Sequence, residues 1–392
     1  MSRMTKYLKD ELDDLQAKGL KRTLRQLRSS QGPLITIDGA TLINFCSNDY
    51  LGLANDERLK MAAVETIEKE GFGSGASRLV CGNMSAHRAL EEGIARFKGC
   101  EDCLVFSTGY MANVGIIASL FDRNDMIFCD RLNHASIFDG ILLSQAKFKR
   151  YAHGDMQALE ELLKEAIPAG KRAIITDSVF SMDGDLAPLD TIVRLAKKYD
   201  CLVMIDEAHA FGVMGEHGRG LAEHFGVERQ IDIQMGTLSK AAGSFGAYVT
   251  GGKDLIDYFI NKARSFIYTT GMPPSVAAAS LKAVEIIQTE PELRSKLWMN
   301  TNIIREGLHH MGFDTMGSET PIIPVLIKDD KTAVTFSKAL LVQGIFVAAI
   351  RPPTVPAHTA RLRISVSAKH TPQQCQQLLQ AMRQAGKDLC LI

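Results

Sequence analysis

Residues 203 to 209 read VMIDEAH, an apolar run that ends in a carboxylate and is followed by a histidine. A short run of this kind is typical of a buried strand, and ligands bind where the strands of an α/β sheet end. A buried carboxylate needs a partner, so Asp206 is predicted to pair with the protonated ring nitrogen of a bound cofactor. An aspartate that caps the next turn is the structural alternative.

Further short apolar runs surround this one between residues 100 and 250, and helical patterns separate them. Helices are expected at 87–98, at 189–199 and from Asp155 to about Pro168–Gly170. Strands that alternate with helices predict a mostly parallel sheet covered by helices. The other runs are CLVFS at 103–107, DMIFCD at 125–130, RAIITD at 172–177, IDIQMGT at 231–237 and GAYVTG at 246–251.

The pattern changes after residues 273–274, where two prolines precede a long helical stretch that passes Trp298 and His309. Later apolar runs predict three more strands, which indicates a second, smaller α+β domain. These strands are expected at 322–327, 345–350 and 362–366. The expected division is an N-terminal helix and arm at 1–45, a large domain at 46–285 and a C-terminal α+β domain at 286–392, with the last boundary inside a helix.

The composition is that of an ordinary globular protein. Of 392 residues, 46% are apolar and 23% charged, and Lys plus Arg equals Asp plus Glu at 45 each. Without an excess of positive charge, binding to nucleic acid or to a membrane is not expected. Residues 1–24 are charged and helix-like without an apolar core, which predicts no signal peptide or membrane span and a cytoplasmic location.

The eight cysteines are too scattered for a disulfide framework in a chain of this length, so free thiols are expected. Cys100 and Cys103 form a C-x-x-C pair, but neither a second pair nor a histidine pair at zinc spacing accompanies them. We therefore expect no metal site and interpret this pair as part of a turn between a helix and a strand.

Lys240 lies in a loop of small residues, 237–243, at the end of the strand predicted at 231–237. A lysine among Gly and Ala residues is expected to be desolvated, which lowers its pKa and makes its amine able to form an imine. Thr237 and Ser239 offer hydroxyl groups to a phosphate beside it. A solvated loop lysine is the structural alternative.

Residues 107–113, STGYMAN, predict a turn between a strand and a helix. The free N–H groups and the dipole at the N-terminus of such a helix favour a phosphate. Farther along, His134 could stack on a planar cofactor, and a hydrogen-bonded structural histidine is the alternative.

Residues 71–76, GFGSGA, match the loose dinucleotide pattern G-x-G-x-x-A. The preceding residues, 65–70, continue a helical pattern instead of a strand, so the context of a dinucleotide site is missing. No P-loop pattern occurs either, which argues against a nucleotide kinase or an ATPase.

Together these segments resemble the α-oxoamine synthase family of fold-type I pyridoxal 5'-phosphate (PLP) enzymes over nearly the whole chain. Four motifs occur in the family's order: CSNDYLGL at 46–53, FSMDGD at 180–185, DEAHAFGVMGEHGRG at 206–220 and TLSK at 237–240. The resemblance implies an α/β transferase fold with a mostly parallel seven-stranded sheet, bound PLP, and a homodimer with its active sites at the subunit interface.

The resemblance also implies roles for individual residues. Lys240 would hold PLP as a Schiff base, Asp206 would pair with the pyridine nitrogen, and His209 would bind the phenolate oxygen. His134 would stack on the ring and act in catalysis with these three residues. The cofactor site would further include Gly109, Tyr110, Ser181 and Thr237, with Thr269 and Thr270 reaching the phosphate of the neighbouring subunit.

Residues 349–365, AIRPPTVPAHTARLRIS, resemble the branch of the family that makes 8-amino-7-oxononanoate in biotin biosynthesis, as do residues 268–274, YTTGMPP. That branch condenses L-alanine with a pimeloyl thioester, carried by coenzyme A or an acyl carrier protein, and releases CO2 and the free thiol. Arg363 would bind the alanine carboxylate as a planar bidentate donor. The other expected substrate residues are Asn48, Thr354 and Arg22 or Arg25, and a solvated helical face is the alternative for the last two.

Other activities of the family remain open, namely 2-amino-3-ketobutyrate CoA ligase, which uses glycine and acetyl-CoA, 5-aminolevulinate synthase and serine palmitoyltransferase. A catalytically silent regulatory subunit is a remote alternative. The presence of Lys240, Asp206 and His209 argues against it.

Overall fold

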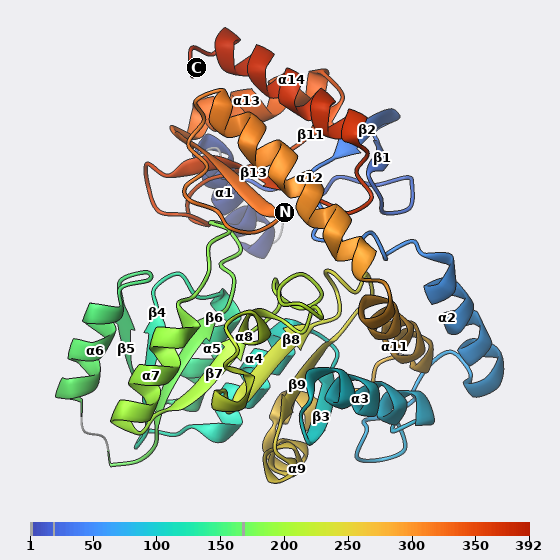
Figure 1. The fold of residues 1–392 in the computed structure, drawn as a ribbon, viewed down its shortest axis with the longest axis vertical. Helices are drawn as coiled ribbons and strands as arrows, with labels where there is room; N and C mark the ends of the chain where they lie inside the picture. The colour runs from blue at the N-terminus through green and yellow to red at the C-terminus, as the bar shows by residue number, and fades with distance from the viewer. Residues whose placement is uncertain (1–2, 19, 167–168) are drawn as a thin grey trace.

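The structure is a computed structural model that describes residues 3–18, 20–166 and 169–392, and a seven-stranded sheet is its largest element (Figure 1). Its strands are β3 (Asp102–Phe106), β4 (Met126–Asp130), β5 (Lys147–Tyr151), β6 (Arg172–Asp177), β7 (Leu202–Asp206), β8 (Ile233–Thr237) and β9 (Ala247–Gly251). They lie in the order β3-β9-β8-β7-β6-β4-β5. Strand β9 is antiparallel to both neighbours and the other pairings are parallel, which confirms the predicted sheet.

Both faces of this sheet are buried, because successive side chains of a strand point to opposite faces. In β7, Val203 and Ile205 belong to one core cluster, whereas Met204 belongs to the other. The first cluster includes side chains of α3 (Ser85–Lys98), α6 (Met156–Glu165), α7 (Leu189–Tyr199) and α11 (Pro274–Thr289). The second includes side chains of α4 (Gly109–Leu120), α5 (Ala135–Ser144), α9 (Lys253–Lys262) and α10 (Arg264–Ile267).

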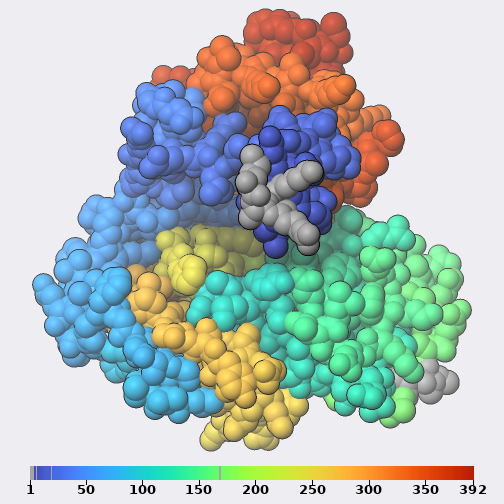
Figure 2. All heavy atoms as spheres, turned by 180° about the vertical axis from the view of Figure 1, so that it is seen from behind, coloured from blue at the N-terminus to red at the C-terminus, as the bar shows by residue number. Residues whose placement is uncertain are grey.

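Residues 322–392 pack above the large sheet in Figure 1, and they also lie at the top in Figure 2, which shows the molecule from behind. Strands β10 (Ile322–Lys328), β13 (Ala360–Ser365) and β12 (Ala348–Ile350) form an antiparallel sheet in that order. A second small sheet joins the two ends of the chain, because β2 pairs with β1 on one side and with β11 on the other. Its strands are β1 (Leu34–Ile37), β2 (Ala40–Asn44) and β11 (Ile345–Phe346).

The remaining helices lie outside the large sheet or in its loops. They are α1 (Arg3–Ala17), α2 (Glu57–Glu70), α8 (Leu221–His224), the short η1 (Glu228–Gln230), α12 (Pro291–His310), α13 (Asp330–Val342) and α14 (Pro372–Asp388). Within the described residues, no helix is both long enough and apolar enough to cross a lipid bilayer.

Most expected elements are present, with three differences in detail. The long helical stretch is two helices, α11 and α12, because Pro291 lacks an N–H group and disfavours a helical conformation at the residue before it. The strand expected at 345–350 is split into β11 and β12, which pair with different sheets. Helix α6 begins after its cap, Asp155, and ends at Glu165, while residues 167–168 of its expected end lie outside the described residues.

Two smaller expectations are confirmed. The glycine-rich segment at 71–76 follows helix α2, not a strand, so it lacks the setting of a dinucleotide site. Cys100 and Cys103 lie where α3 gives way to β3, and the cysteines are free thiols.

Candidate active site

Two buried carboxylates lie side by side where parallel strands of the large sheet end. Asp177 ends β6 and Asp206 ends β7, and the two are partners in register. The Oδ2 atom of Asp206 accepts a hydrogen bond of 2.8 Å from Nδ2 of Asn113, and its Oδ1 atom accepts one of 2.8 Å from the backbone N–H of Ala208. Asp206 is therefore held in one orientation.

Lys240 follows β8 and interacts electrostatically with both carboxylates. Burial lowers its pKa to about 8, although Asp206 and Asp177 attract its positive charge, and the charge of Arg363 adds to the lowering. Among the described residues its amine makes no hydrogen bond or ion pair with another side chain. An amine with these properties is unusually available for nucleophilic attack or proton transfer near neutral pH.

His134 belongs to a hydrogen-bond network that reaches both carboxylates. Its backbone N–H donates to Oδ2 of Asp177 at 2.6 Å, and its Nδ1 lies 2.7 Å from Oγ of Ser136. Ser136 in turn accepts from Nδ2 of Asn113 at 2.9 Å. Burial, opposed by the charge of Asp206, lowers the pKa of His134, so its ring is neutral near pH 7.

His209 lies in the loop after β7 and contacts the N-terminal segment. Its Nδ1 atom lies 2.7 Å from the phenol oxygen of Tyr50. Burial lowers the pKa of His209 well below its usual range, and the charges of Lys240 and Arg363 act in the same direction. The ring is therefore a neutral imidazole held by a tyrosine.

Arg363 brings the C-terminal sheet into the same cluster. It lies on β13 with 6% of its surface exposed. Its Nε donates to the carbonyl oxygen of Ser181 at 2.6 Å, its Nη1 to Oγ of Ser365 at 2.6 Å and its Nη2 to Oδ1 of Asn48 at 3.1 Å. Oδ1 of Asn48 also lies 3.3 Å from the phenol oxygen of Tyr50, so four predicted residues, Asn48, Ser181, His209 and Arg363, belong to one connected set.

The N-terminus of α4 lies beside the loop that leads to Lys240. Thr108 caps this helix by accepting from the backbone N–H of Met111 at 3.1 Å. A side chain at Gly109 would meet Thr237 at 3.9 Å, and Thr237 lies 2.8 Å from Oγ of Ser239. The helix end and these hydroxyl groups therefore lie close together, and the sequence predicts that they bind a phosphate.

Tyr110 is half exposed and its phenol donates a short hydrogen bond to Asp139, which raises the pKa of Tyr110. Its ring lies at the rim of this arrangement, on the first turn of α4.

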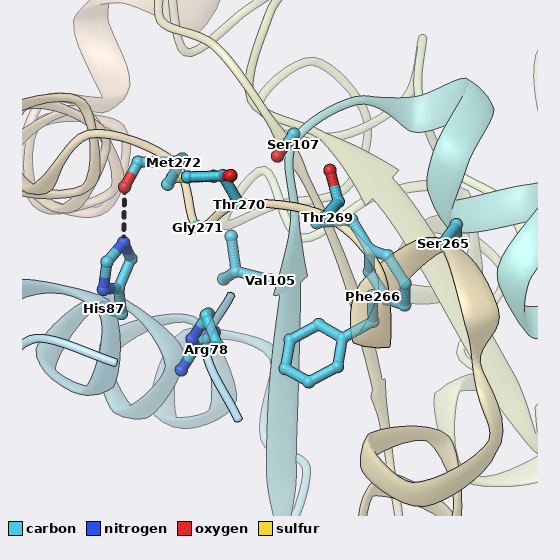
Figure 3. A pocket seen from close by; sticks show the side chains of 11 residues that line it. Arg78, His87, Val105, Ser107, Ser265, Phe266, Thr269, Thr270, Gly271 and Met272 are labelled. Carbon is cyan, nitrogen blue, oxygen red and sulfur yellow. Dashed lines mark hydrogen bonds between the residues drawn. The ribbon is translucent and has the colours of Figure 1, made fainter. Parts of the chain in front are cut away.

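The structure does not place Thr269 and Thr270 in contact with Lys240. Both line a separate small pocket with Arg78, His87 and Ser107 (Figure 3). The carbonyl oxygen of Met272 accepts hydrogen bonds from His87 at 2.7 Å and from Ser74 at 2.5 Å, which fixes this loop.

The arm residues meet the C-terminal domain at the surface. Nη2 of Arg22 lies 3.5 Å from Oγ1 of Thr354, and both side chains are exposed. The guanidinium of Arg25 lies 5.3 Å from the ring centre of Phe346. Two predicted substrate residues are thus adjacent, but neither is hydrogen-bonded to the set around Arg363 among the described residues.

The sequence pattern does not identify three residues of the cluster as site residues. Asn113 and Tyr50 lie inside segments of the predicted site, but which side chain orients Asp206 or His209 depends on tertiary contacts. Asp177 carried a usable signal, since it ends the run RAIITD in the same way that Asp206 ends its own run.

These residues fit PLP. A lysine of lowered pKa, a buried carboxylate and a helix N-terminus with hydroxyl groups match an aldehyde, a pyridine nitrogen and a phosphate in turn. The Oδ1 atom of Asn113 is buried without a hydrogen-bond partner among the described residues, which indicates that the arrangement is completed by a bound group.

Comparisons with known proteins agree with this geometry. The family model of class I and II aminotransferases matches residues 40–382. An 8-amino-7-oxononanoate synthase of Geobacter sulfurreducens is 51% identical over 99% of this chain and 100% of its own length, and one of Thermosipho melanesiensis is 47% identical over 97% and 98%.

Solved structures show the same fold. Serine palmitoyltransferase of Sphingomonas wittichii superposes with a TM-score of 0.94 at 32% identity, covering both chains completely. A structure of serine palmitoyltransferase with PLP gives 0.94 at 33% identity with the same coverage. An 8-amino-7-oxononanoate synthase of Francisella tularensis gives 0.77 at 32% identity, over 88% of this chain and 98% of its own.

Proposed function

This chain belongs to the class I and II aminotransferase family and, within it, to the 8-amino-7-oxononanoate synthases, and we propose that it condenses L-alanine with a pimeloyl thioester. The products are 8-amino-7-oxononanoate, CO2 and the free thiol of coenzyme A or of an acyl carrier protein. Identity of about half over nearly the full length to several synthases of this name carries the proposal.

PLP is the cofactor of the family, and when bound it supplies an electron-withdrawing ring that accepts negative charge from the substrate's α-carbon. Lys240 would hold it through the amine, and Asp206 would face its ring nitrogen. The N-terminus of α4 would hold its phosphate together with Thr237. His209, which Tyr50 keeps in place, would donate to its phenolate oxygen, and Ser181, which accepts from Arg363, would line the same pocket.

Lys240 also moves a proton. With a pKa of about 8, an appreciable fraction of its amine is neutral at physiological pH, so it can remove the proton from the α-carbon of alanine. The neighbouring carboxyl groups of Asp206 and Asp177 stabilise the ammonium group that results.

Arg363 would bind the carboxylate of alanine. Its guanidinium already donates to three protein oxygens, and N–H groups remain on Nη1 and Nη2 for a planar anion. Asn48 fixes one edge of the guanidinium and so contributes to its orientation.

The bond-forming step joins the α-carbon of alanine to the thioester carbonyl carbon. The C–S bond breaks and the thiol leaves with a proton. The carboxylate of alanine is then lost as CO2, and a proton takes its place on the α-carbon. His134, whose lowered pKa keeps it neutral, would donate a hydrogen bond to the acyl oxygen during the attack. Arg22 and Thr354, which are adjacent at the surface, would meet the far end of the acyl chain.

A homodimer is part of the proposal. The loop with Thr269 and Thr270 is anchored in its own chain, and Thr270 is exposed. Large apolar side chains around this loop are exposed to solvent. Phe72, Val80 and Tyr268 are 73%, 78% and 71% exposed. A second copy would cover them and place the two threonines near its cofactor phosphate.

Thiol release from a matrix of amino acids and acyl-CoA thioesters tests the proposed reaction. L-Alanine with pimeloyl-CoA is expected to give a larger kcat/KM than any other pair. If glycine with acetyl-CoA is preferred, the chain is a 2-amino-3-ketobutyrate CoA ligase instead. If no pair releases thiol from PLP-loaded protein, the proposal is wrong.

A further inference from the structure

The turn at residues 180–185 carries a contact that orients Arg363. The carbonyl oxygen of Ser181 accepts from Nε of Arg363 at 2.6 Å. Two residues later, Asp183 pairs with Arg361, which is 2% exposed. Because side chains two apart on a strand share a face, both arginines of β13 reach the same turn.

The turn is rigid and packs directly on the C-terminal sheet. The backbone N–H of Phe180 donates to the carbonyl of Asp185 at 3.1 Å, and that of Gly184 donates to Phe180 at 2.8 Å. Gly184 has a φ of 71°, and a Cβ there would lie 2.1 Å from the carbonyl oxygen of Ile322. A displacement of any part of this turn is therefore transmitted to Ser181.

His153 fixes the turn from the side of the large sheet. Its Nε2 lies 2.6 Å from Oδ2 of Asp185, and its Nδ1 lies 3.0 Å from Oδ1 of Asp130, the last residue of β4. Asp130 is itself held by the backbone N–H groups of Leu132 and Gly154, at 2.8 and 3.0 Å.

The imidazole of His153 is charged under ordinary conditions. Burial alone would lower its pKa, but the hydrogen bonds and charges of Asp130 and Asp185 outweigh burial and raise the pKa to about 10. The edge of its ring also packs on Phe180, with ring centres 4.4 Å apart. One cation thus bridges β4 and the turn, which strengthens both hydrogen bonds.

We propose that His153 is a positioning residue for amino acid binding, because it holds the turn whose Ser181 carbonyl orients Arg363. The proposal rests on the proposed function, in which Arg363 binds the alanine carboxylate. A bidentate contact depends on the angle of the guanidinium, so a loosened turn weakens binding of the amino acid. Among the described residues, no hydrogen bond joins His153 to the thioester residues Arg22 and Thr354, so we expect thioester binding to be unaffected.

The test uses PLP-loaded full-length protein and titrates L-alanine calorimetrically without thioester. His153→Gln and Asp185→Asn are each expected to weaken alanine binding by about tenfold, since each removes a charge-assisted hydrogen bond. The KM for pimeloyl-CoA should stay within about twofold. His217→Gln is the matched control, because His217 also binds a carboxylate, that of Glu223 at 2.6 Å, but within the described part of the chain has no hydrogen bond to the turn.

A double-mutant cycle separates positioning from general destabilisation. Arg363→Lys is expected to weaken alanine binding, and His153→Gln should then add little, because the group it positions is gone. Two results would overturn this inference but not the proposed function. They are additive effects in the cycle, and unchanged alanine binding in both His153→Gln and Asp185→Asn. Unchanged binding in Arg363→Lys would overturn the proposed role of Arg363 and the inference with it. Asp185→Asn is isosteric, so it carries the test if His153→Gln does not fold.

Discussion

Asp177 and Asp206 end neighbouring parallel strands directly opposite one another, and both are buried. Burial and the negative charge of Asp206 raise the pKa of Asp177 well above its usual range. Asp177 is therefore harder to ionise than an exposed aspartate, in part because Asp206 lies opposite it. The two aspartates look alike in the sequence but have different partners, since Asn113 donates to Asp206 and the backbone N–H of His134 donates to Asp177.

Substitution of each carboxyl group by an amide should expose this difference. Asp206→Asn is expected to lower kcat by at least about 100-fold, because an amide cannot hold a ring nitrogen in its protonated form. Asp177→Asn should change kcat by no more than about fivefold, since it replaces a group that already resists ionisation and can still accept from His134. Steady-state kinetics with saturating PLP measure both, and equal losses would contradict the assignment.

Asn113→Asp should weaken PLP binding. Nδ2 of Asn113 donates to Asp206, and Asn113 is 1% exposed, so the substitution sets a second oxygen against a carboxylate in a buried place. We expect a loss of about 2 kcal/mol, or roughly 30-fold in Kd, from fluorescence titration. Asn302→Asp, an exposed change on α12, is the control and should leave the Kd unchanged.

Lys240 should set the pH dependence of cofactor capture. Burial lowers its pKa to about 8 from 10.5, so the rate at which cofactor-free protein captures PLP should rise with pH and level off above about 8. Stopped-flow absorbance measures this rate, and a rise that continues to pH 10 would contradict the lowered pKa.

Borohydride reduction should fix PLP on the peptide that contains Lys240. Lys240→Ala should still bind PLP without a covalent bond, but lose the fixed label, the visible absorbance and the activity. Mass spectrometry of the digested protein identifies the labelled peptide, and a label on another lysine would exclude the proposed role.

His153 should make stability depend on pH in the alkaline range. Its pKa is about 10 in the folded protein against 6.5 for an unperturbed histidine. The stabilisation is therefore fully present below about pH 6.5 and is lost as the pH rises through about 10. In urea unfolding, the advantage of the unmodified protein over His153→Gln should shrink across this window, and a constant difference would contradict the raised pKa.

Glu91→Gln should destabilise the loop that carries Thr269 and Thr270. The side chain of Glu91 is 3% exposed and binds through both oxygens to Arg78, which lines the pocket of Figure 3. Loss of one member of a buried pair costs about 3 kcal/mol of unfolding free energy. Chemical unfolding measures this loss. If the loop serves a second subunit, the variant should also bind PLP more weakly, whereas Glu92→Gln on the exposed side of α3 should not.

The alternation of strands and helices was predictable because local patterns decide it. The helix at Leu189–Tyr199 has the predicted bounds, and Pro291 could have revealed the break between α11 and α12. The split of residues 345–350 could not be predicted, since β11 and β12 separate only through their pairing with β2 and β13. Strand pairing between distant segments leaves no local signal.

The candidate site likewise contains residues that the local sequence reveals and residues that only tertiary contacts reveal. Lys240 and Asp206 were predictable because each lies at the end of an apolar strand, where ligands bind in α/β sheets. Asn113 and Tyr50 were not, because their importance arises from the side chains they meet, Asp206 and His209. Arg363 came from resemblance alone, and the structure connects it to Asn48 across more than three hundred positions.

The small sheet that joins β2 to β11 cannot form until late in translation, because its strands lie far apart in the sequence. Ile43 pairs with Ile345, so β2 leaves the ribosome about 15 to 60 s before its partner at ordinary rates of translation. During that interval the edge of β2 that β11 later covers stays open to other strands, and Asn48 and Tyr50 cannot meet Arg363. Newly made chains should therefore depend on chaperones until the last fifty or so residues are complete, and truncation before β13 should give aggregation instead of a partly active enzyme.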